Sequence, residues 1–251
     1  MSINLFLAWQ DPETRTWHTF ARLHKNGGDY ELAFTRGAQR LGAIPFNLFK
    51  LDISKIYRFE TLIPIFRNRL PSKSRSDFAR MATWLNLTGA EDEFSQLGRF
   101  GLIPGTDSIL IYPEPEIIRG MYHLEFFVHG IRHMHKDVPE ICDGINKGDR
   151  LLPLLDLQNP VDQNAVALRC EDDPMLIGYV PTFYATDVRR LLSDSAIEAS
   201  ARFTVIRSNK DAPLQLKLLC KFEAFASAQF RPLDTDAHKL LRNELPAELA
   251  V

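Results

Sequence analysis

Residues 156–168 read Asp-Leu-Gln-Asn-Pro-Val-Asp-Gln-Asn-Ala-Val-Ala-Leu. Proline presets φ within this run, and the side chains of Asn159 and Asp162 can hydrogen-bond to their own backbone, so the run predicts a tight polar turn. The residues that follow, Asn164–Leu168, are mostly apolar and predict a buried strand. We therefore expect a tight turn followed by a strand, with Asn164 able to tie the two together.

Short apolar segments separated by turn residues continue on both sides of this loop. The strands predicted in this half of the chain span residues 124–128, 149–155, 164–168, 176–180, 199–206 and 214–220. A helix is predicted after the fourth strand, with Tyr184, Val188, Leu191 and Leu192 on one face. Many short strands at close spacing indicate a small barrel that is closed or nearly closed.

The first half of the chain predicts a small antiparallel sheet followed by a helix. The strands predicted there span residues 5–9, 17–23 and 30–34. Gly27-Gly28 favours a hairpin, because glycine adopts positive φ without steric cost. A loop region is expected from about Gly37 to Ser74, and Ser76 can cap the helix that follows. Pro113-Glu114-Pro115 then predicts a domain boundary, since proline continues neither a helix nor a sheet.

Composition limits the classes of function. The chain has 251 residues, of which 45% are hydrophobic and 25% charged, which is typical of soluble globular proteins. Its net charge of −2 argues against a protein that coats long stretches of nucleic acid, but recognition of a strand end needs few phosphate contacts. There is no signal-peptide pattern and no apolar run near the roughly 20 residues that span a bilayer, so a cytoplasmic setting is expected.

The cysteines and histidines predict no metal site. Cys142, Cys170 and Cys220 show no CxxC spacing, and we expect reduced core thiols. Residues 123–135 hold four histidines, three of which would share a face if the segment were a strand. A metal site there is conceivable, but no carboxylate or cysteine with ligand spacing completes it, so core or surface histidines are the default interpretation.

Three segments of the second half together resemble the HIRAN domain. They read Val128-His129-Gly130-Ile131-Arg132-His133-Met134, then residues 156–168 as quoted above, then Ile177-Gly178-Tyr179-Val180-Pro181. The corresponding family patterns are G-[LI]-R-Y-Y, D/E-P-x-N-P-Y-D-x-N-A-V and G-Y-V-P. The resemblance covers residues 119–225 in consistent order and spacing. It implies a small β-barrel with two helices that captures the 3′ end of single-stranded DNA, as in a fork-remodelling helicase-like ATPase.

The resemblance also implies roles for individual residues. Asn159 and Asp162 would hydrogen-bond to a terminal hydroxyl or a base, and Arg132 would contact phosphate. His133 and Tyr179 would offer flat faces for base stacking. The structural alternative is that the loop residues only hold one tight connection. The family usually has tyrosines at the positions of His133, Met134 and Val161, so stacking, worth roughly 1–3 kcal/mol per base, would be reduced here.

The first half resembles the N-terminal subdomain of HipA-type kinases. The likeness rests on Ala21-Arg22-Leu23 before the glycine hairpin, on Tyr30 and Phe34, and on residues 62–71, which read Leu-Ile-Pro-Ile-Phe-Arg-Asn-Arg-Leu-Pro. The chain has no glycine-rich phosphate loop with a following lysine and no catalytic-loop motif of a kinase. The resemblance therefore implies a binding role and no phosphoryl transfer.

Residues 58–80 are the most basic stretch of the chain. The candidate phosphate patch within it consists of Arg67, Arg69, Lys73 and Arg75. The alternative interpretation is a solvated loop.

These observations predict an α+β protein that is mostly β. Residues 1–116 are expected to form a HipA N-terminal-like domain with a small β-sheet and a helix. Residues 119–225 are expected to form a HIRAN-like β-barrel with two helices, and residues 226–251 a tail with a short amphipathic helix over residues 234–241.

The expected function is binding of single-stranded DNA ends through the 3′ hydroxyl, in DNA processing or defence in a bacterial cytoplasm. No enzyme activity, cofactor, metal or membrane association is expected. The alternative is an antitoxin-like protein that binds and regulates a HipA-type kinase or another DNA-processing protein.

Overall fold

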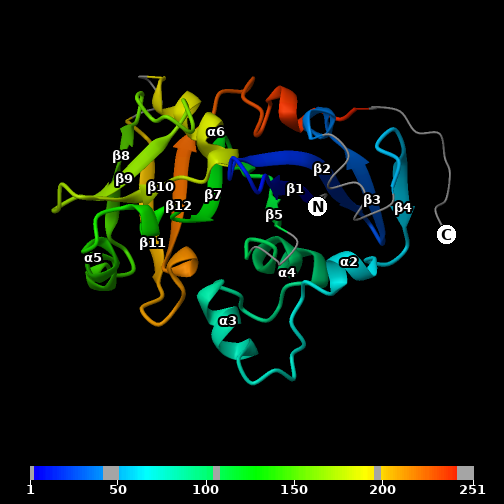
Figure 1. Cartoon of the computed structure of the whole chain (residues 1–251), viewed down its shortest axis with the longest axis horizontal. Helices are drawn as coiled ribbons and strands as arrows, with labels where there is room; N and C mark the ends of the chain where they lie inside the picture. The colour runs from blue at the N-terminus through cyan, green and yellow to red at the C-terminus, as the bar shows by residue number, and fades with distance from the viewer. Residues whose placement is uncertain (1–2, 42–50, 104–107, 195–198, 242–251) are drawn as a thin grey trace. The chain divides into compact units, whose positions relative to one another are not determined.

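The computed structural model describes residues 3–41, 51–103, 108–194 and 199–241 (Figure 1). Two antiparallel sheets and short helices make it α+β and mostly β, so the predicted fold class is confirmed. The chain divides into two compact units. Unit 1 comprises the residues up to 83, residues 87–114 and those from 234 onward, and unit 2 comprises residues 84–86 and 115–233. The domain limits expected from the sequence stay a prediction.

The sheet of unit 1 has five strands in the order β4-β3-β2-β1-β5. The strands are β1 (Ile3–Gln10), β2 (Trp17–Asn26), β3 (Asp29–Phe34), β4 (Ile56–Phe59) and β5 (Ile109–Pro113). Asn26 pairs with Asp29 around the two glycines, as the hairpin signal predicts. The expected loop between Gly37 and Ser74 is wrong in part, because β4 lies within it. Only four residues long, with Ile56 and Tyr57 buried side by side, β4 has no alternating pattern to reveal it.

Short helices complete unit 1. They are the 3₁₀ turn η1 (Arg36–Arg40), α2 (Pro64–Arg67), α3 (Phe78–Trp84) and α4 (Glu93–Phe100). The helix expected after Ser76 is present as α3, but none of its residues is buried. Helix α4 was not predicted, although Asp92 caps it by accepting a hydrogen bond from the Ser95 amide (2.8 Å).

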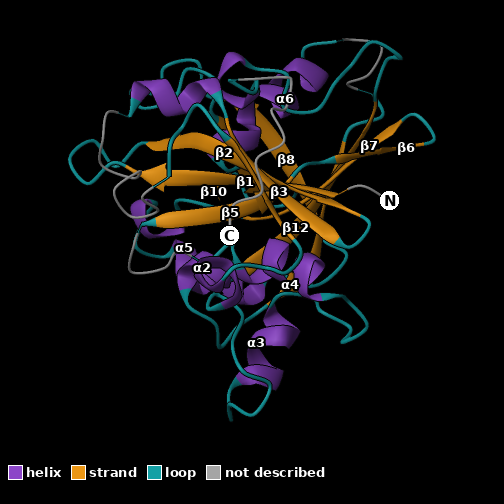
Figure 2. Ribbon diagram, turned by 90° about the vertical axis from the view of Figure 1, so that its right-hand side faces the viewer, coloured by secondary structure: helices purple, strands orange, loops and turns teal. Residues whose placement is uncertain are grey.

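Helix α4 lies against β5 (Figure 2). Gly101 at its end permits this packing, because a Cβ there would lie 2.5 Å from the Cβ of Ile111. The helix buries Phe94, Leu97 and Phe100. The core of unit 1 is thereby closed on one face of the sheet.

The C-terminal segment of unit 1 forms little helix. The helix expected over residues 234–241 is replaced by the 3₁₀ turn η4 (Asp236–His238). Backbone pairing explains the difference, since the Arg36 amide donates to the Lys239 carbonyl (2.7 Å) and the Leu241 amide to the Phe34 carbonyl (2.9 Å). Tertiary hydrogen bonds therefore override a local amphipathic pattern. Residues 242–251 of the expected tail lie outside the described residues.

His238 holds this segment in place. Its Nε2 is 2.9 Å from the Tyr112 hydroxyl, and its Nδ1 is 2.7 Å from the hydroxyl of Thr235. The ring stands edge-on to Phe6 at a centroid distance of 5.0 Å. Burial lowers the pKa of His238 to about 4, so the ring is neutral in the folded protein at neutral pH.

This pKa predicts acid sensitivity of unit 1. The unfolded chain protonates a histidine near pH 6.5, whereas the folded protein does so only near pH 4, so stability is full above 6.5 and is lost as the pH falls towards 4. A loss of about 3 kcal/mol from this one group is expected across that window. In NMR, the His238 imidazole signals should stay those of the neutral ring down to about pH 5. Titration of that ring near pH 6.5 in the folded protein would contradict the burial argument.

The sheet of unit 2 has seven strands in the order β10-β9-β8-β11-β12-β7-β6. The strands are β6 (Glu116–Ile118), β7 (Met121–Phe127), β8 (Arg150–Leu155), β9 (Val166–Cys170), β10 (Leu176–Tyr179), β11 (Arg202–Ser208) and β12 (Leu218–Phe225). The helices are η2 (Ile131–His133), α5 (Val138–Gly144), α6 (Thr182–Leu192) and η3 (Leu214–Leu216). All six strands predicted for this half have a counterpart. The last one, predicted over residues 214–220, begins only at Leu218, after the 3₁₀ turn η3.

The predicted barrel was closed or nearly closed, and strand pairing among the described residues does not close the sheet. Strand β7 ends at Phe127 and β10 has only four residues, so the two approach one another only at the bridge between His129 and Tyr179. There the His129 amide donates to the Tyr179 carbonyl (2.9 Å) and the Tyr179 amide to the His129 carbonyl (2.8 Å). The sheet is thus strongly curved, with one bridge between its two sides.

The three cysteines are free thiols, two of them buried, as expected of core thiols. Burial raises the pKa of Cys142 to about 12, which keeps it protonated and unreactive. Across the described part of the chain, histidines, cysteines and carboxylates form no cluster suited to a metal ion. The helices described there are also too short or too polar to cross a bilayer.

Candidate nucleic-acid interface

The loop between β8 and β9 is held by its own side chains. Oδ1 of Asn159 accepts from the amides of Val161 and Asp162 (3.0 Å each), and Oδ1 of Asp162 accepts from the Asn164 amide (2.8 Å). Two consecutive side-chain turns therefore fix the loop, as the sequence predicts. The side-chain oxygen of Asn159 thus accepts two backbone hydrogen bonds within the loop, and a contact of Asn159 with nucleic acid stays a prediction.

Asp156 links this loop to strand β10. Its Oδ2 accepts from Nδ2 of Asn159 (3.0 Å) and from the hydroxyl of Tyr179 (3.0 Å). Burial, then the hydrogen bond to Asp156, raises the pKa of Tyr179, so its hydroxyl remains a donor. Asp156 was not among the predicted site residues, although it begins the quoted loop segment. The acidic side chain at the start of that segment was the one feature of the sequence that could have indicated this role.

Arg132 and His133 lie on an exposed 3₁₀ turn. Gly130, with φ of +77°, precedes the turn, and Nε of Arg132 donates to Nε2 of His133 (2.9 Å). Because this segment is a turn, the condition under which His129, His133 and His135 would share one face of a strand is not met. His129 instead stands edge-on to a phenylalanine ring, and burial lowers its pKa to about 4.

The bridge between His129 and Tyr179 joins these two parts of the site. It requires Gly178, whose φ is +152° and whose hypothetical Cβ would lie 2.5 Å from the His129 carbonyl oxygen. The turn that carries Arg132 starts directly after the bridge. Strand β10 is therefore the element that brings the Arg132 turn and the Asn159 loop to one region of unit 2.

Apolar side chains are exposed on the same loop. Leu157 is 68% exposed and Val161 is 73% exposed, and Leu154 at the end of β8 is 54% exposed. Exposed apolar side chains beside fixed polar groups are typical of a binding surface. Val161 therefore offers an aliphatic contact on this surface.

Asp162 faces a cation from helix α6. Burial raises the pKa of Asp162, while the amide of Asn164 and the charge of Arg189 oppose that rise. Among the described residues, Oδ2 of Asp162 receives no hydrogen bond. The carboxylate therefore keeps an acceptor for a ligand.

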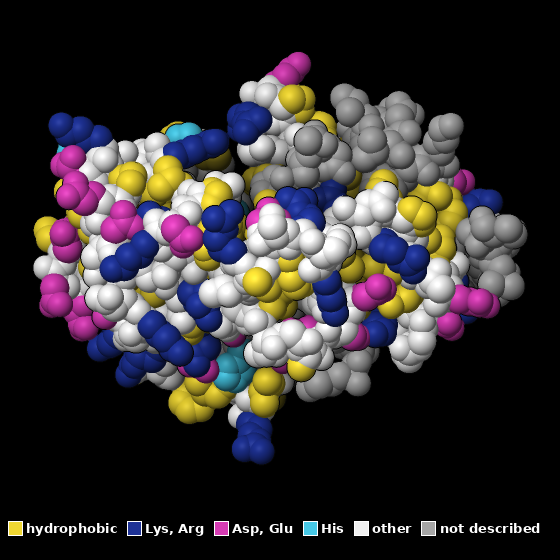
Figure 3. All heavy atoms as spheres, turned by 90° about the horizontal axis from the view of Figure 1, so that it is seen from below, with side chains coloured by type: hydrophobic (Ala, Val, Ile, Leu, Met, Phe, Trp, Pro, Cys, Tyr) yellow, Lys and Arg dark blue, Asp and Glu magenta, His cyan; other side chains and the backbone are white. Residues whose placement is uncertain are grey.

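The candidate phosphate patch lies in unit 1 and is partly engaged. Nη1 of Arg69 donates to the Ile109 carbonyl (3.0 Å), and Arg75 forms two hydrogen bonds with Asp77 (2.9 and 2.8 Å). Arg67 and Lys73 are exposed. On the face drawn in Figure 3, basic and acidic side chains are interspersed, with no continuous basic surface. A role for these four residues in phosphate binding stays a prediction.

Comparison with known proteins places a family match in unit 2. The HIRAN domain model matches residues 121–224. Two solved structures have weak likeness to the chain. The HIRAN domain of human HLTF is 13% identical, with 41% of this chain and 75% of that chain covered and a TM-score of 0.33. A protein from Lactobacillus plantarum is 16% identical, with 42% and 99% covered and a TM-score of 0.32.

Neither of these structural likenesses is close enough to carry an argument about this chain. A search of curated proteins found no match. The predicted likeness of residues 1–116 to HipA-type kinases receives no support from these comparisons and stays a hypothesis, as does a kinase partner.

Proposed function

We propose, from the HIRAN domain that residues 121–224 form, that this protein binds nucleic acid and recognises the 3′ end of single-stranded DNA without catalysing a reaction. The observation that supports this most is that β10 contacts both the polar loop between β8 and β9 and the segment that leads into the exposed turn η2. The loop contributes Asp162, and the turn contributes Arg132.

The chemistry of a strand end suits this surface. A terminal hydroxyl both donates and accepts, and the second carboxylate oxygen of Asp162 provides an acceptor for it. The exposed guanidinium of Arg132 would pair with the adjacent phosphate. Leu157 and Val161 would contact the sugar or base by their apolar surface. Asn159 would act here as a positioning residue, because its side chain holds the loop.

The charge of the chain favours an end over an extended strand. A net charge of −2 supplies no broad electrostatic attraction for phosphates. A site that takes one terminus needs only one or two phosphate contacts, so binding should show a shallow salt dependence. Recognition would then rest on the hydroxyl and on contacts with the last nucleotides.

Fluorescence anisotropy with the full chain tests this proposal. Short single strands with a free 3′ hydroxyl should bind at least tenfold more tightly than the same strands ending in a 3′-deoxy sugar, since a hydrogen bond to a charged group is worth about 1.5–3 kcal/mol. The variant Asp162→Asn should lose most of that preference. Asp172→Asn, at an exposed carboxylate in the hairpin after β9, is the matched control and should behave as wild type. Negligible binding of both strands by the wild-type protein would end the proposal.

A further inference from the structure

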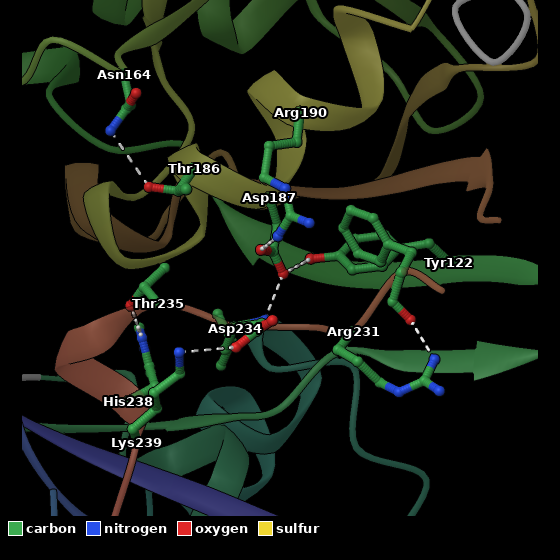
Figure 4. Close-up of polar contacts among 12 residues, drawn as sticks. Tyr122, Asn164, Thr186, Asp187, Arg190, Arg231, Asp234, Thr235, His238 and Lys239 are labelled. Atoms are coloured by element: carbon green, nitrogen blue, oxygen red, sulfur yellow. Dashed lines mark hydrogen bonds and ion pairs between the residues drawn. The ribbon is translucent and has the colours of Figure 1, made fainter. Parts of the chain in front are cut away.

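A polar groove of about 560 Å³ adjoins the loop, within unit 2. It is lined by Asn164, Thr186, Arg189, Arg190, Ser193 and Asp194. Figure 4 shows Asn164 and Thr186 pointing towards one another at one side, with Nδ2 of Asn164 donating to Oγ1 of Thr186 (3.3 Å). The groove is shallow and largely open to solvent, so it can contact one group of a larger ligand. The loop and helix α6 thus form the two walls of one opening.

The Arg190 side chain contacts Phe230 and Asp187 and is still 45% exposed. Its guanidinium lies 4.7 Å above the ring of Phe230, and its Nη1 is 4.0 Å from Oδ1 of the buried Asp187. A guanidinium has five N–H donors in one plane, and Arg190 lines the groove while it contacts Phe230 and Asp187. These two contacts restrict the side chain, which lowers the entropy cost of ordering it on a planar, doubly accepting group.

Arg189 connects the groove to the loop. Its Nη1 donates to the Gln163 carbonyl, between Asp162 and Asn164. A ligand in the groove would therefore lie next to the carboxylate proposed to hold the strand end. The sequence alone gave no reason to single out either arginine, because both look like ordinary basic residues in the last turn of a helix.

Two guanidinium groups line the groove, together with the carboxylate of Asp194 and the neutral polar side chains of Asn164, Thr186 and Ser193. Asp162 lies near Arg189 and Asp187 near Arg190, so an anion would be held by the N–H donors of the arginines and not by an excess of positive charge. Arginine and phosphate form paired hydrogen bonds of high geometric specificity. An alternative role for Arg189 and Arg190, in the last turn of α6, is to offset the negative end of the helix dipole. That role does not require the two residues to line a groove beside the loop.

We propose that this groove holds a phosphate group of the bound strand, beside the residues that take its terminus. The proposal rests on the proposed function, since it assigns a second contact to the same strand. It makes Arg190 a phosphate-binding residue, and it extends the interface from β10 along helix α6.

The salt dependence of strand binding by the full chain tests this assignment. Loss of one phosphate contact should reduce the slope of log affinity against log salt by about 0.7 for a single strand. We expect this reduction, and about tenfold weaker binding at low salt, for Arg190→Gln. We expect the opposite change for Ser193→Lys, which adds a cation to the groove at an exposed position. Arg150→Gln, at an exposed arginine on β8 paired with Glu171, is the control and should keep the wild-type slope.

The Ser193 variant keeps the test independent of folding, because Arg190→Gln also removes an ion pair to a buried acid. If the wild-type protein binds strands but neither variant changes the slope, the groove holds no phosphate of the strand and the proposed function still stands. If the wild-type protein binds no strand, the proposed function fails. In that case, titration with inorganic phosphate tests whether the groove binds phosphate, through the NMR signals of the Thr186 and Ser193 amides. Shifts of these signals in the wild-type protein that are absent in Arg190→Gln would support a phosphate site in the groove. No shifts in the wild-type protein would overturn it.

Discussion

Replacing Gly178 with alanine is expected to destabilise unit 2 by at least about 2 kcal/mol and to weaken strand binding with it. Two costs add at this position. An L-residue is strained at φ of +152°, and the new methyl group would lie 2.5 Å from both the His129 carbonyl oxygen and Cγ1 of Val128. The His129 carbonyl cannot move freely because it accepts a hydrogen bond from the Tyr179 amide, and the Val128 side chain is fully buried.

The measurement is equilibrium unfolding of the full chain together with hydrogen exchange of the His129 and Tyr179 amides. Gly120→Ala is the matched control, because Gly120 also has a positive φ (+77°) but no atom within 4 Å of its hypothetical Cβ. It should show the conformational strain without the clash and should leave both amides protected. Equal effects of the two substitutions would show that close approach at Gly178 does not matter.

Replacing Asp187 with alanine is expected to cost about 3 kcal/mol of stability in unit 2. The carboxylate is buried in helix α6, and its Oδ2 accepts from the Leu233 amide (2.7 Å) and from the Tyr122 hydroxyl (3.3 Å) (Figure 4). Its Oδ1 faces Arg190. Alanine would leave a buried amide and a buried hydroxyl without their acceptor, and Arg190 without its counter-charge.

Hydrogen exchange locates this effect. The Leu233 amide should lose its protection from exchange in Asp187→Ala. The segment between β12 and Leu233 should then open first, because the hydrogen bond from the Leu233 amide to Asp187 links it to α6. Asp187→Asn is the graded comparison, since its side-chain oxygen can still accept from the amide while the charge is gone. It should lie between the alanine variant and wild type. An alanine variant with wild-type stability and an unchanged Leu233 amide would contradict this account.

Sequence patterns predicted local structure best where side chains act on their own backbone. The double turn at Asn159 and Asp162 and the hairpin at Gly27 are of this kind, and both are confirmed. Strand β4 and helix α4 were missed because each is short and shares its burial with distant elements. The C-terminal helix expected over residues 234–241 was wrong for a related reason, since backbone pairing with Arg36 replaces local bonds.

The candidate site shows the same division. Turn chemistry could predict that the loop is rigid, but not that Asp156 would join it to Tyr179 or that Arg189 would reach the Gln163 carbonyl. Those contacts depend on how β8, β10 and α6 are placed around one another, which no local pattern encodes. The resemblance to the HIRAN domain located the region. The structure distinguishes the side chains that hold the loop, such as Asn159, from those with a polar atom still open to a ligand, such as Asp162.

Unit 1 is built from chain segments on both sides of unit 2, which has a consequence for its folding during translation. Its sheet can pair as soon as β5 emerges, yet Arg36 and Phe34 find their last backbone partners only in Lys239 and Leu241, after all of unit 2 has been translated. Until then the Arg36 amide has only water to bind. Nascent chains arrested before residue 234 should therefore carry a unit 1 that proteases open more readily than the finished protein.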